Sequence, residues 1–230
     1  HHERAPVPEP LRPHLGPGDG ADHAVVGVDD VDQLLACSLD GHGRVLPERG
    51  TVPPMSPTVR RGVFPGSFDP LTVAHVAVAD AAVEALALDR LELSVSRGAL
   101  GKPHLDQTLD ERVAELRTAV ASRPGWGVVV TTARLLADVA DGFDALVLGA
   151  DKLAQVLDPS WYGSAEERDA AVLRLPTVAV APRTGQDLSG LVDAARRAGV
   201  DLVVLDVADH LHEVSASAVR AGRHDWRAVG

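Results

Sequence analysis

Thr72 and His75 stand three residues apart just after a glycine turn, and these residue types at this spacing can bind phosphate. Val63 and Phe64 can close a short strand, after which Gly66 lets the backbone turn sharply. Residues three apart share one helix face, so the hydroxyl and the imidazole can point at one ligand over a helix N-terminus, where N–H groups and the dipole attract anions. Phosphate handling is therefore the predicted chemistry, and simple helix capping by His75 is the alternative.

A second candidate element lies near the C-terminus, where Ser215 and Ser217 precede Arg220. Serines at a helix start commonly cap N–H groups and need no other role. Arg220, however, follows Ser217 by three residues, so the hydroxyl and the guanidinium can grip phosphate oxygens together on one helix face. We therefore favour a second phosphate-binding element here.

Short apolar segments alternate with helical ones from residue 61 onward. The strand candidates, each apolar enough to be buried on both faces, are residues 63–64, 91–95, 128–131, 145–148, 177–181 and 202–205. The helix candidates are residues 73–88, 108–122, 133–140 and 188–198. This alternation implies right-handed crossovers and an α/β fold built on a doubly wound parallel sheet, as in Rossmann-like proteins.

On such a sheet, ligands bind at the carboxyl ends of the strands. The turn at Gly66, the segment from Gly149 to Asp151 and the segment at Ser215 each follow a predicted strand. All three should therefore meet at one edge of the sheet. Asp151 could also serve only as a cap for the helix that follows it.

The composition limits the partners of the chain. A net charge of -11 argues against nucleic acid and anionic membranes as partners, because an acidic surface repels both. No apolar run is long enough to span a bilayer, so a soluble protein is predicted. The single Cys37 excludes an intramolecular disulfide and fits a reducing cytoplasm. The composition predicts no particular oligomeric state.

The first 60 residues differ from the rest of the chain. They hold nine of the 16 prolines and open with a proline-rich stretch that cannot form regular hydrogen-bonded structure. Residues 1–60 are therefore predicted to be a partly disordered extension with room for a small module. Residues 61–230 are predicted to form the α/β domain.

The first motif and the C-terminal motif, in this order, resemble those of a known enzyme family. The run Gly66-Ser67-Phe68-Asp69-Pro70, followed by Thr72 and His75, resembles the signature of cytidylyltransferase-like nucleotidyltransferases. These enzymes join a nucleoside monophosphate to a phosphorylated acceptor and release pyrophosphate. Residues 214–220 are similar to the family's Ile-Ser-Ser-Thr-x-Ile-Arg segment. Ala74 and Ala216 depart from the family pattern, which has glycine and serine there.

The resemblance implies a role for each motif and makes residues 61–230 a nucleotidyltransferase domain. His75 would donate to phosphate oxygens, Thr72 would bind the α-phosphate, and Arg220 would grip the leaving phosphates. The nucleotide-binding residues that it implies are Gly66, Ser67, Phe68, Gly149, Asp151, Ser215 and Ser217. Mg²⁺ carried by ATP is the expected cofactor, held largely by phosphates and water, and no metal site on the protein is predicted.

The acceptor is suggested by residues 146–151, Leu-Val-Leu-Gly-Ala-Asp, and by the downstream Trp161. They are similar to the branch that adenylates nicotinate or nicotinamide mononucleotide, which would place Asp151 at a ribose hydroxyl and stack Trp161 on the pyridine ring. Lys102 could neutralise the acceptor phosphate or be an ordinary solvated lysine. The predicted enzyme is thus an adenylyltransferase of NAD biosynthesis, with ATP and a small phosphorylated acceptor as partners.

Three alternatives stay open. The first motif is also similar to phosphopantetheine adenylyltransferases, although the arginine-rich acceptor segment of that branch has no counterpart here. CTP could replace ATP, because base selection depends on backbone contacts that the sequence does not display. Ala74, Ala216 and the extension also fit a catalytically degenerate nucleotide-binding module.

Overall fold

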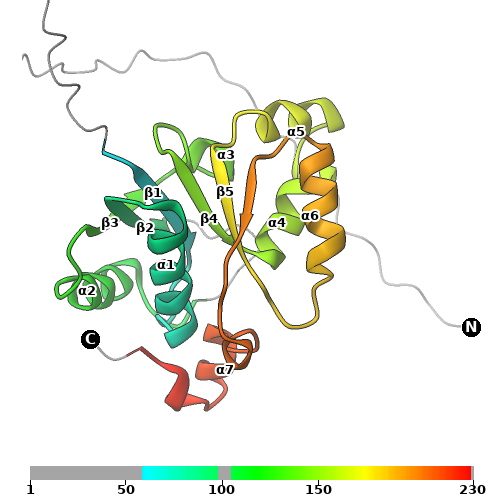
Figure 1. The fold of residues 1–230 in the computed structure, drawn as a ribbon. Coiled ribbons are helices and arrows are strands. Elements are labelled where there is room, and N and C mark those ends of the chain that lie inside the picture. The colour runs from blue at the N-terminus through cyan, green and yellow to red at the C-terminus, as the bar shows by residue number, and fades with distance from the viewer. Residues whose placement is uncertain (1–58, 98–104, 229–230) are drawn as a thin grey trace, which may run out of the picture. The chain divides into compact units, whose positions relative to one another are not determined.

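Six parallel strands form one sheet in the computed structural model, which describes residues 59–97 and 105–228. The strands are β1 (Arg61–Gly66), β2 (Arg90–Ser96), β3 (Trp126–Thr131), β4 (Ala145–Gly149), β5 (Thr177–Ala181) and β6 (Leu202–Val204). Their order across the sheet is β3-β2-β1-β4-β5-β6, so the connections reverse direction between β1 and β4 (Figure 1). This is a doubly wound, Rossmann-like sheet, and the predicted fold class is confirmed.

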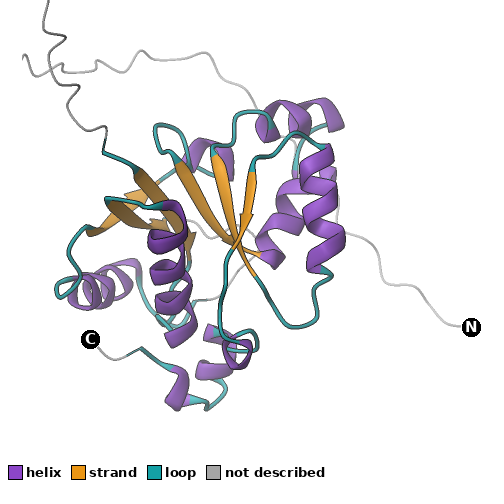
Figure 2. Cartoon of the chain, in the orientation of Figure 1, coloured by secondary structure: helices purple, strands orange, loops and turns teal. Residues whose placement is uncertain are grey.

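Helices cover both faces of this sheet (Figure 2). They are α1 (Val73–Leu86), α2 (Leu109–Val120), α3 (Leu136–Val139), α4 (Ala150–Leu157), α5 (Ala165–Val172), α6 (Leu188–Arg197) and α7 (Ala216–Arg220). Three single 3-10 turns, η1 (Pro159–Trp161), η2 (Asp209–Leu211) and η3 (His224–Trp226), complete the regular structure of the described residues. Helix α5 was not predicted from the sequence, because its apolar positions are few and lie near its end.

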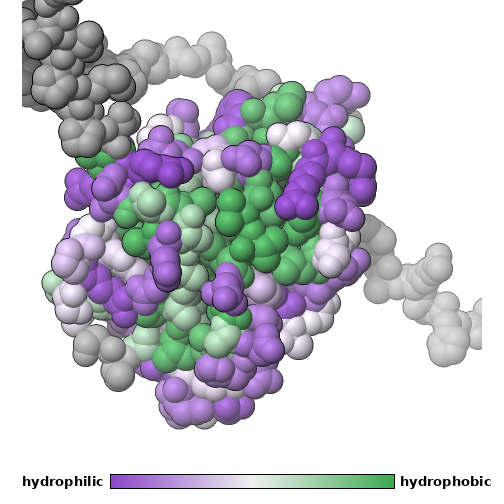
Figure 3. All heavy atoms as spheres, viewed as in Figure 1, coloured by the Kyte–Doolittle hydropathy of each residue, from purple (hydrophilic) through white to green (hydrophobic). Residues whose placement is uncertain are grey.

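The core is divided into two layers by the sheet. Leu93 and Val147 belong to the layer that holds α1 and α2, whereas Val63 and Leu146 belong to the layer that holds α3, α4 and α6. Neighbouring residues of a strand point to opposite faces, so the continuous apolar runs of β1 and β4 serve both layers. Part of the apolar surface remains visible between α1 and α6 in Figure 3.

The two edge strands differ from the sequence prediction of burial on both faces. Val129 and Val130 of β3 are 36% and 37% exposed, and Val204 of β6 is 43% exposed. Each of these strands has a neighbour on one side only, so its side chains lack part of the cover that central strands receive.

The junction between β1 and β4 is short. β1 pairs with β2 from Arg61 to Gly66, but it pairs with β4 only at Gly62 and Val63. Beyond these positions the carboxyl ends of β1 and β4 are not paired with each other. A ligand site is expected here, because the sheet reverses its direction of winding at this point.

Two predicted parts of the chain lie outside the described residues. They are residues 1–58 of the N-terminal extension and the candidate Lys102. Among the residues that the structure does describe, no helix combines the length and the apolar character needed to cross a bilayer.

Candidate active site

A cleft of about 150 Å³ opens at the carboxyl ends of the central strands. The ends of β1, β4 and β5, the first turn of α1 and the segment that enters α7 all contribute to its lining. Seven of the predicted site residues line this cleft: Gly66, Ser67, His75, Gly149, Asp151, Ser215 and Ser217. Segments that are far apart in the sequence thus meet at one edge of the sheet.

The first turn of α1 fixes the imidazole of His75. The backbone N–H of Thr72 donates to Nδ1 of His75 at 3.1 Å, and the Thr72 hydroxyl lies 2.8 Å from the same nitrogen. In return the backbone N–H of His75 donates to the Thr72 hydroxyl at 3.3 Å, which completes a capping box. Because Nδ1 accepts a backbone N–H, the ring proton of the neutral imidazole must lie on Nε2.

Thr72 itself has an exposed fraction of 0% and is not among the residues that line the cleft. Its hydroxyl is engaged with His75. The geometry therefore favours a role for Thr72 in orienting the imidazole, whereas its predicted contact with the α-phosphate stays a prediction.

Two phenylalanine rings hold the imidazole from the core side. The ring centroids of Phe68 and His75 lie 5.2 Å apart, those of Phe64 and His75 lie 6.2 Å apart, and Phe68 is 1% exposed. A Cβ atom at Gly66 would come within 2.6 Å of the Phe68 ring, so only glycine fits there. Phe68 adopts a φ of 45°, which bends the loop so that its ring turns inward.

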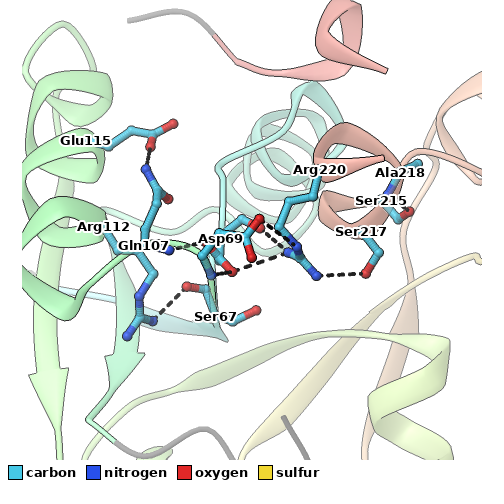
Figure 4. Close-up of polar contacts among 10 residues, drawn as sticks. Ser67, Asp69, Gln107, Arg112, Glu115, Ser215, Ser217, Ala218 and Arg220 are labelled. Atoms are coloured by element: carbon cyan, nitrogen blue, oxygen red, sulfur yellow. Dashed lines mark hydrogen bonds and ion pairs between the residues drawn. The ribbon is translucent and has the colours of Figure 1, made fainter. Parts of the chain in front are cut away.

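Arg220 lies beside the cleft and is held by the loop between β1 and α1 (Figure 4). Its Nη1 donates to the backbone oxygen and, at 3.3 Å, to the carboxylate of Asp69. Its Nη2 donates to the hydroxyl of Ser217 at 3.2 Å, and its side chain is 24% exposed. Arg220 therefore links a cleft-lining serine to the first motif, although it does not line the cleft itself.

Two further cations line the cleft and were not predicted from the sequence, Lys152 of α4 and Arg183 after β5. The Nη1 of Arg183 donates to the backbone oxygen of Val214 at 3.0 Å, next to Ser215. Lys152 donates to Gln155 at 2.7 Å. A lysine or arginine just after a predicted strand is the sequence signal that could have identified them.

Asp151 is the single carboxylate among the cleft-lining residues. It is exposed and lies in the first turn of α4, where the N-cap is Gly149 rather than Asp151. Within the described residues, no group of three or more His, Cys, Asp or Glu could hold a metal ion.

Trp161 lies in η1, where it is 44% exposed, and it is not among the residues that line the cleft. Its predicted contact with the acceptor stays a prediction, as does that of Lys102. Phe68 does not line the cleft either, because its side chain is buried.

Comparison with known proteins identifies the family to which this chain is similar. The cytidylyltransferase-like family model matches residues 63–222. A probable nicotinate-nucleotide adenylyltransferase of Bordetella avium is 32% identical over 142 residues, which are 56% of this chain and 72% of the relative. A phosphopantetheine adenylyltransferase of Rhodospirillum rubrum is 42% identical over 89 residues, but these are only 37% of this chain and 49% of that relative.

A solved structure of similar fold is the nicotinic acid mononucleotide adenylyltransferase of Plasmodium falciparum complexed with NaAD. The TM-score is 0.52 at 14% identity, with 70% of this chain and 82% of the other covered. At that identity the likeness concerns the fold alone.

Proposed function

Because the chain belongs to the cytidylyltransferase-like family, we propose that it transfers AMP from ATP to nicotinate or nicotinamide mononucleotide and releases pyrophosphate. The observation that carries this proposal is the meeting of both motifs, with Gly149 and Asp151, around one cleft. The relative in Bordetella avium supports the choice of acceptor, since the aligned residues cover 72% of its length.

The reaction needs no covalent intermediate on the protein. A phosphate oxygen of the acceptor attacks the α-phosphorus of ATP, and the bond from that phosphorus to the bridging oxygen of the β-phosphate breaks. Pyrophosphate leaves with the bonding electrons. Catalysis then consists of positioning and charge stabilisation.

His75 is the residue best placed to stabilise the transferring phosphate. Its Nδ1 accepts the backbone N–H of Thr72, so the ring proton of the neutral imidazole lies on Nε2, and His75 lines the cleft. A donor fixed in advance gains more from the developing negative charge than one that must first be oriented. Arg183 and Lys152 add positive charge to the lining of the same cleft.

Asp151 suits the ribose, because its carboxylate can accept hydrogen bonds from two hydroxyls. A magnesium ion that arrives with ATP would neutralise part of the triphosphate charge. In agreement with the single Cys37, we place this activity in the cytoplasm.

The test is release of pyrophosphate from ATP in the presence of one acceptor at a time. Nicotinate mononucleotide, nicotinamide mononucleotide and phosphopantetheine are the acceptors, and CTP replaces ATP in a parallel series. We expect the largest kcat/KM with ATP and a pyridine mononucleotide. Turnover with phosphopantetheine alone would move the enzyme to the other branch, and ATP binding without any turnover would indicate a binding module.

A further inference from the structure

Asp69 is a buried carboxylate to which the sequence analysis assigned no role. It lies in the loop between β1 and α1 with an exposed fraction of 0%. Its two oxygens accept the backbone N–H groups of Asp106 and Gln107, each at 3.0 Å. Nη1 of Arg220 lies 3.3 Å from Oδ2 of Asp69 and also donates to its backbone oxygen.

These bonds join the loop between β1 and α1 to the segment before α2 and to α7 (Figure 4). Asp106 and Gln107 precede α2, which in turn carries Arg112. Nη1 of Arg112 donates to the backbone oxygen of Ser67 at 2.8 Å, and Ser67 lines the cleft. Arg220 connects the same carboxylate to α7, where it donates to Ser217. Asp69 thus connects α7 and the segment before α2 to the loop that carries Ser67.

Asp69 belongs to a cluster of charged side chains. Arg112 is 2% exposed, and its Nε has no hydrogen-bond partner in the described part of the chain. Burial lowers the pKa of Arg112, and the charge of the nearby Asp69 opposes this effect. Arg220 contacts a second carboxylate as well, because its Nε lies 3.6 Å from Oδ2 of Asp106. The two cations, Arg112 and Arg220, are therefore balanced by the two anions, Asp69 and Asp106.

We propose that Asp69 is a positioning residue for the transfer reaction. Asp69 holds the guanidinium of Arg220 in position, and Arg220 in turn holds the hydroxyl of Ser217. Both groups then lie at the place where the outer phosphates of ATP bind. This inference rests on the proposed function for its reaction, but it concerns the binding of a triphosphate and can be tested without the acceptor.

The principal test is Asp69→Asn, which keeps the shape of the side chain and removes its charge. An amide cannot accept two N–H groups and a guanidinium at once, so Arg220 loses its bond to the Asp69 side chain and is held less firmly by its remaining contacts. We expect affinity for a non-hydrolysable ATP analogue, measured by calorimetry, to fall about 10-fold, while affinity for AMP stays unchanged because AMP lacks the outer phosphates. Equal losses for both nucleotides would overturn the proposal, since they would indicate general damage to the site.

A double-mutant comparison tests whether Asp69 acts through Arg220. Asp69→Asn should lower kcat about 10-fold to 10²-fold, as expected for small misplacements of catalytic groups. In an Arg220→Met background the same change should have almost no further effect. Additive losses would show that the two residues act separately. The control is Asp80→Asn, which removes the partner of Arg123 on the exposed side of α1 and should leave turnover unchanged.

Arg220→Lys provides a second route if Asp69→Asn does not fold. Lysine keeps the positive charge, but it cannot contact Asp69 and Ser217 with two nitrogens at once. The proposal predicts a similar loss of ATP-analogue affinity, and wild-type affinity in this variant would contradict it. Absence of pyrophosphate release by the wild-type protein would instead count against the proposed function, because the analogue titrations do not depend on turnover.

Discussion

Helices α1 and α2 begin with the same hydrogen-bonding device, and they use it in different surroundings. At α2 the hydroxyl and the N–H of Thr108 each lie 2.8 Å from one carboxylate oxygen of Glu111. At α1, Thr72 makes the equivalent bonds to a ring nitrogen of His75. Thr108 and Glu111 are exposed, whereas Thr72 is buried and His75 lines the cleft.

The difference shows how a local motif that stabilises a helix can also position a ligand donor. Glutamate at the third helical position uses its carboxylate for the cap, and it has no second functional group to offer a ligand. Imidazole has a second nitrogen on the opposite side of its ring, so it can fill the cap with Nδ1 and present Nε2 to the cleft. In α1 the same hydrogen bonds therefore stabilise the helix start and orient the donor.

Of the residues in the two capping boxes, His75 should have the largest effect on turnover when it is replaced. In His75→Ala, kcat should fall about 10²-fold to 10³-fold, the usual loss for a donor that stabilises charge in a transition state. In His75→Gln, glutamine can still complete the cap, so Tm should stay close to that of the wild type while turnover is lost. Near-normal turnover in either variant would refute the proposed role of the imidazole.

Removing the threonine of each box should separate capping from positioning. Thr72→Ala and Thr108→Ala should each destabilise the protein by about 1 kcal/mol, as measured by denaturant unfolding. Only Thr72→Ala should also lower kcat, by about 10-fold to 10²-fold, because the imidazole loses its orientation. If both variants retained full turnover, orientation by Thr72 would have no catalytic value.

Trp161 belongs to neither box and gives a reference for substrate binding alone. In Trp161→Ala, the KM for the mononucleotide acceptor should rise about 3-fold to 10-fold with little change in kcat, because an aromatic stacking contact is lost. Its exposure of 44% makes a large loss of stability unexpected. An unchanged acceptor KM would place the pyridine ring elsewhere.

The smallest expected effect concerns the pH dependence of the α2 box. Hydrogen bonds from the N–H and the hydroxyl of Thr108 hold the pKa of Glu111 below its ordinary value of 4.5. A lowered pKa stabilises the folded state above the unfolded pKa, and this stabilisation is lost as the pH falls through the folded value. The difference in Tm between wild type and Glu111→Gln should therefore stay constant above about pH 5 and shrink below about pH 4.

A control for this titration is Glu84→Gln, an exposed substitution on α1 outside both boxes. Its difference in Tm from the wild type gives the effect of removing one negative charge from a helix surface. A parallel decline in both variants would mean that the effect comes from net charge, not from the cap.

The fold was largely predictable because its strands are short, apolar and regularly spaced. All six lie where the alternation predicted them, and the motifs at Gly66 and Ser215 do line one cleft. The place of Asp69 was not predictable, since its partners lie 37, 38 and 151 residues away. Lys152 and Arg183 were predictable in principle, because each follows a predicted strand, but their residue types are common on any surface and did not distinguish them.

β1 pairs with β4 at Gly62 and Val63 only, so a bound nucleotide could also help to hold these two strands together. Elsewhere the strands are joined by backbone bonds along most of their length, but here a molecule reaching from Gly66 to Gly149 would span the unjoined part. Such a molecule would stabilise the folded protein by bridging the two strands, in addition to being its substrate. The protein without a nucleotide should therefore unfold at a lower temperature than the protein with one bound.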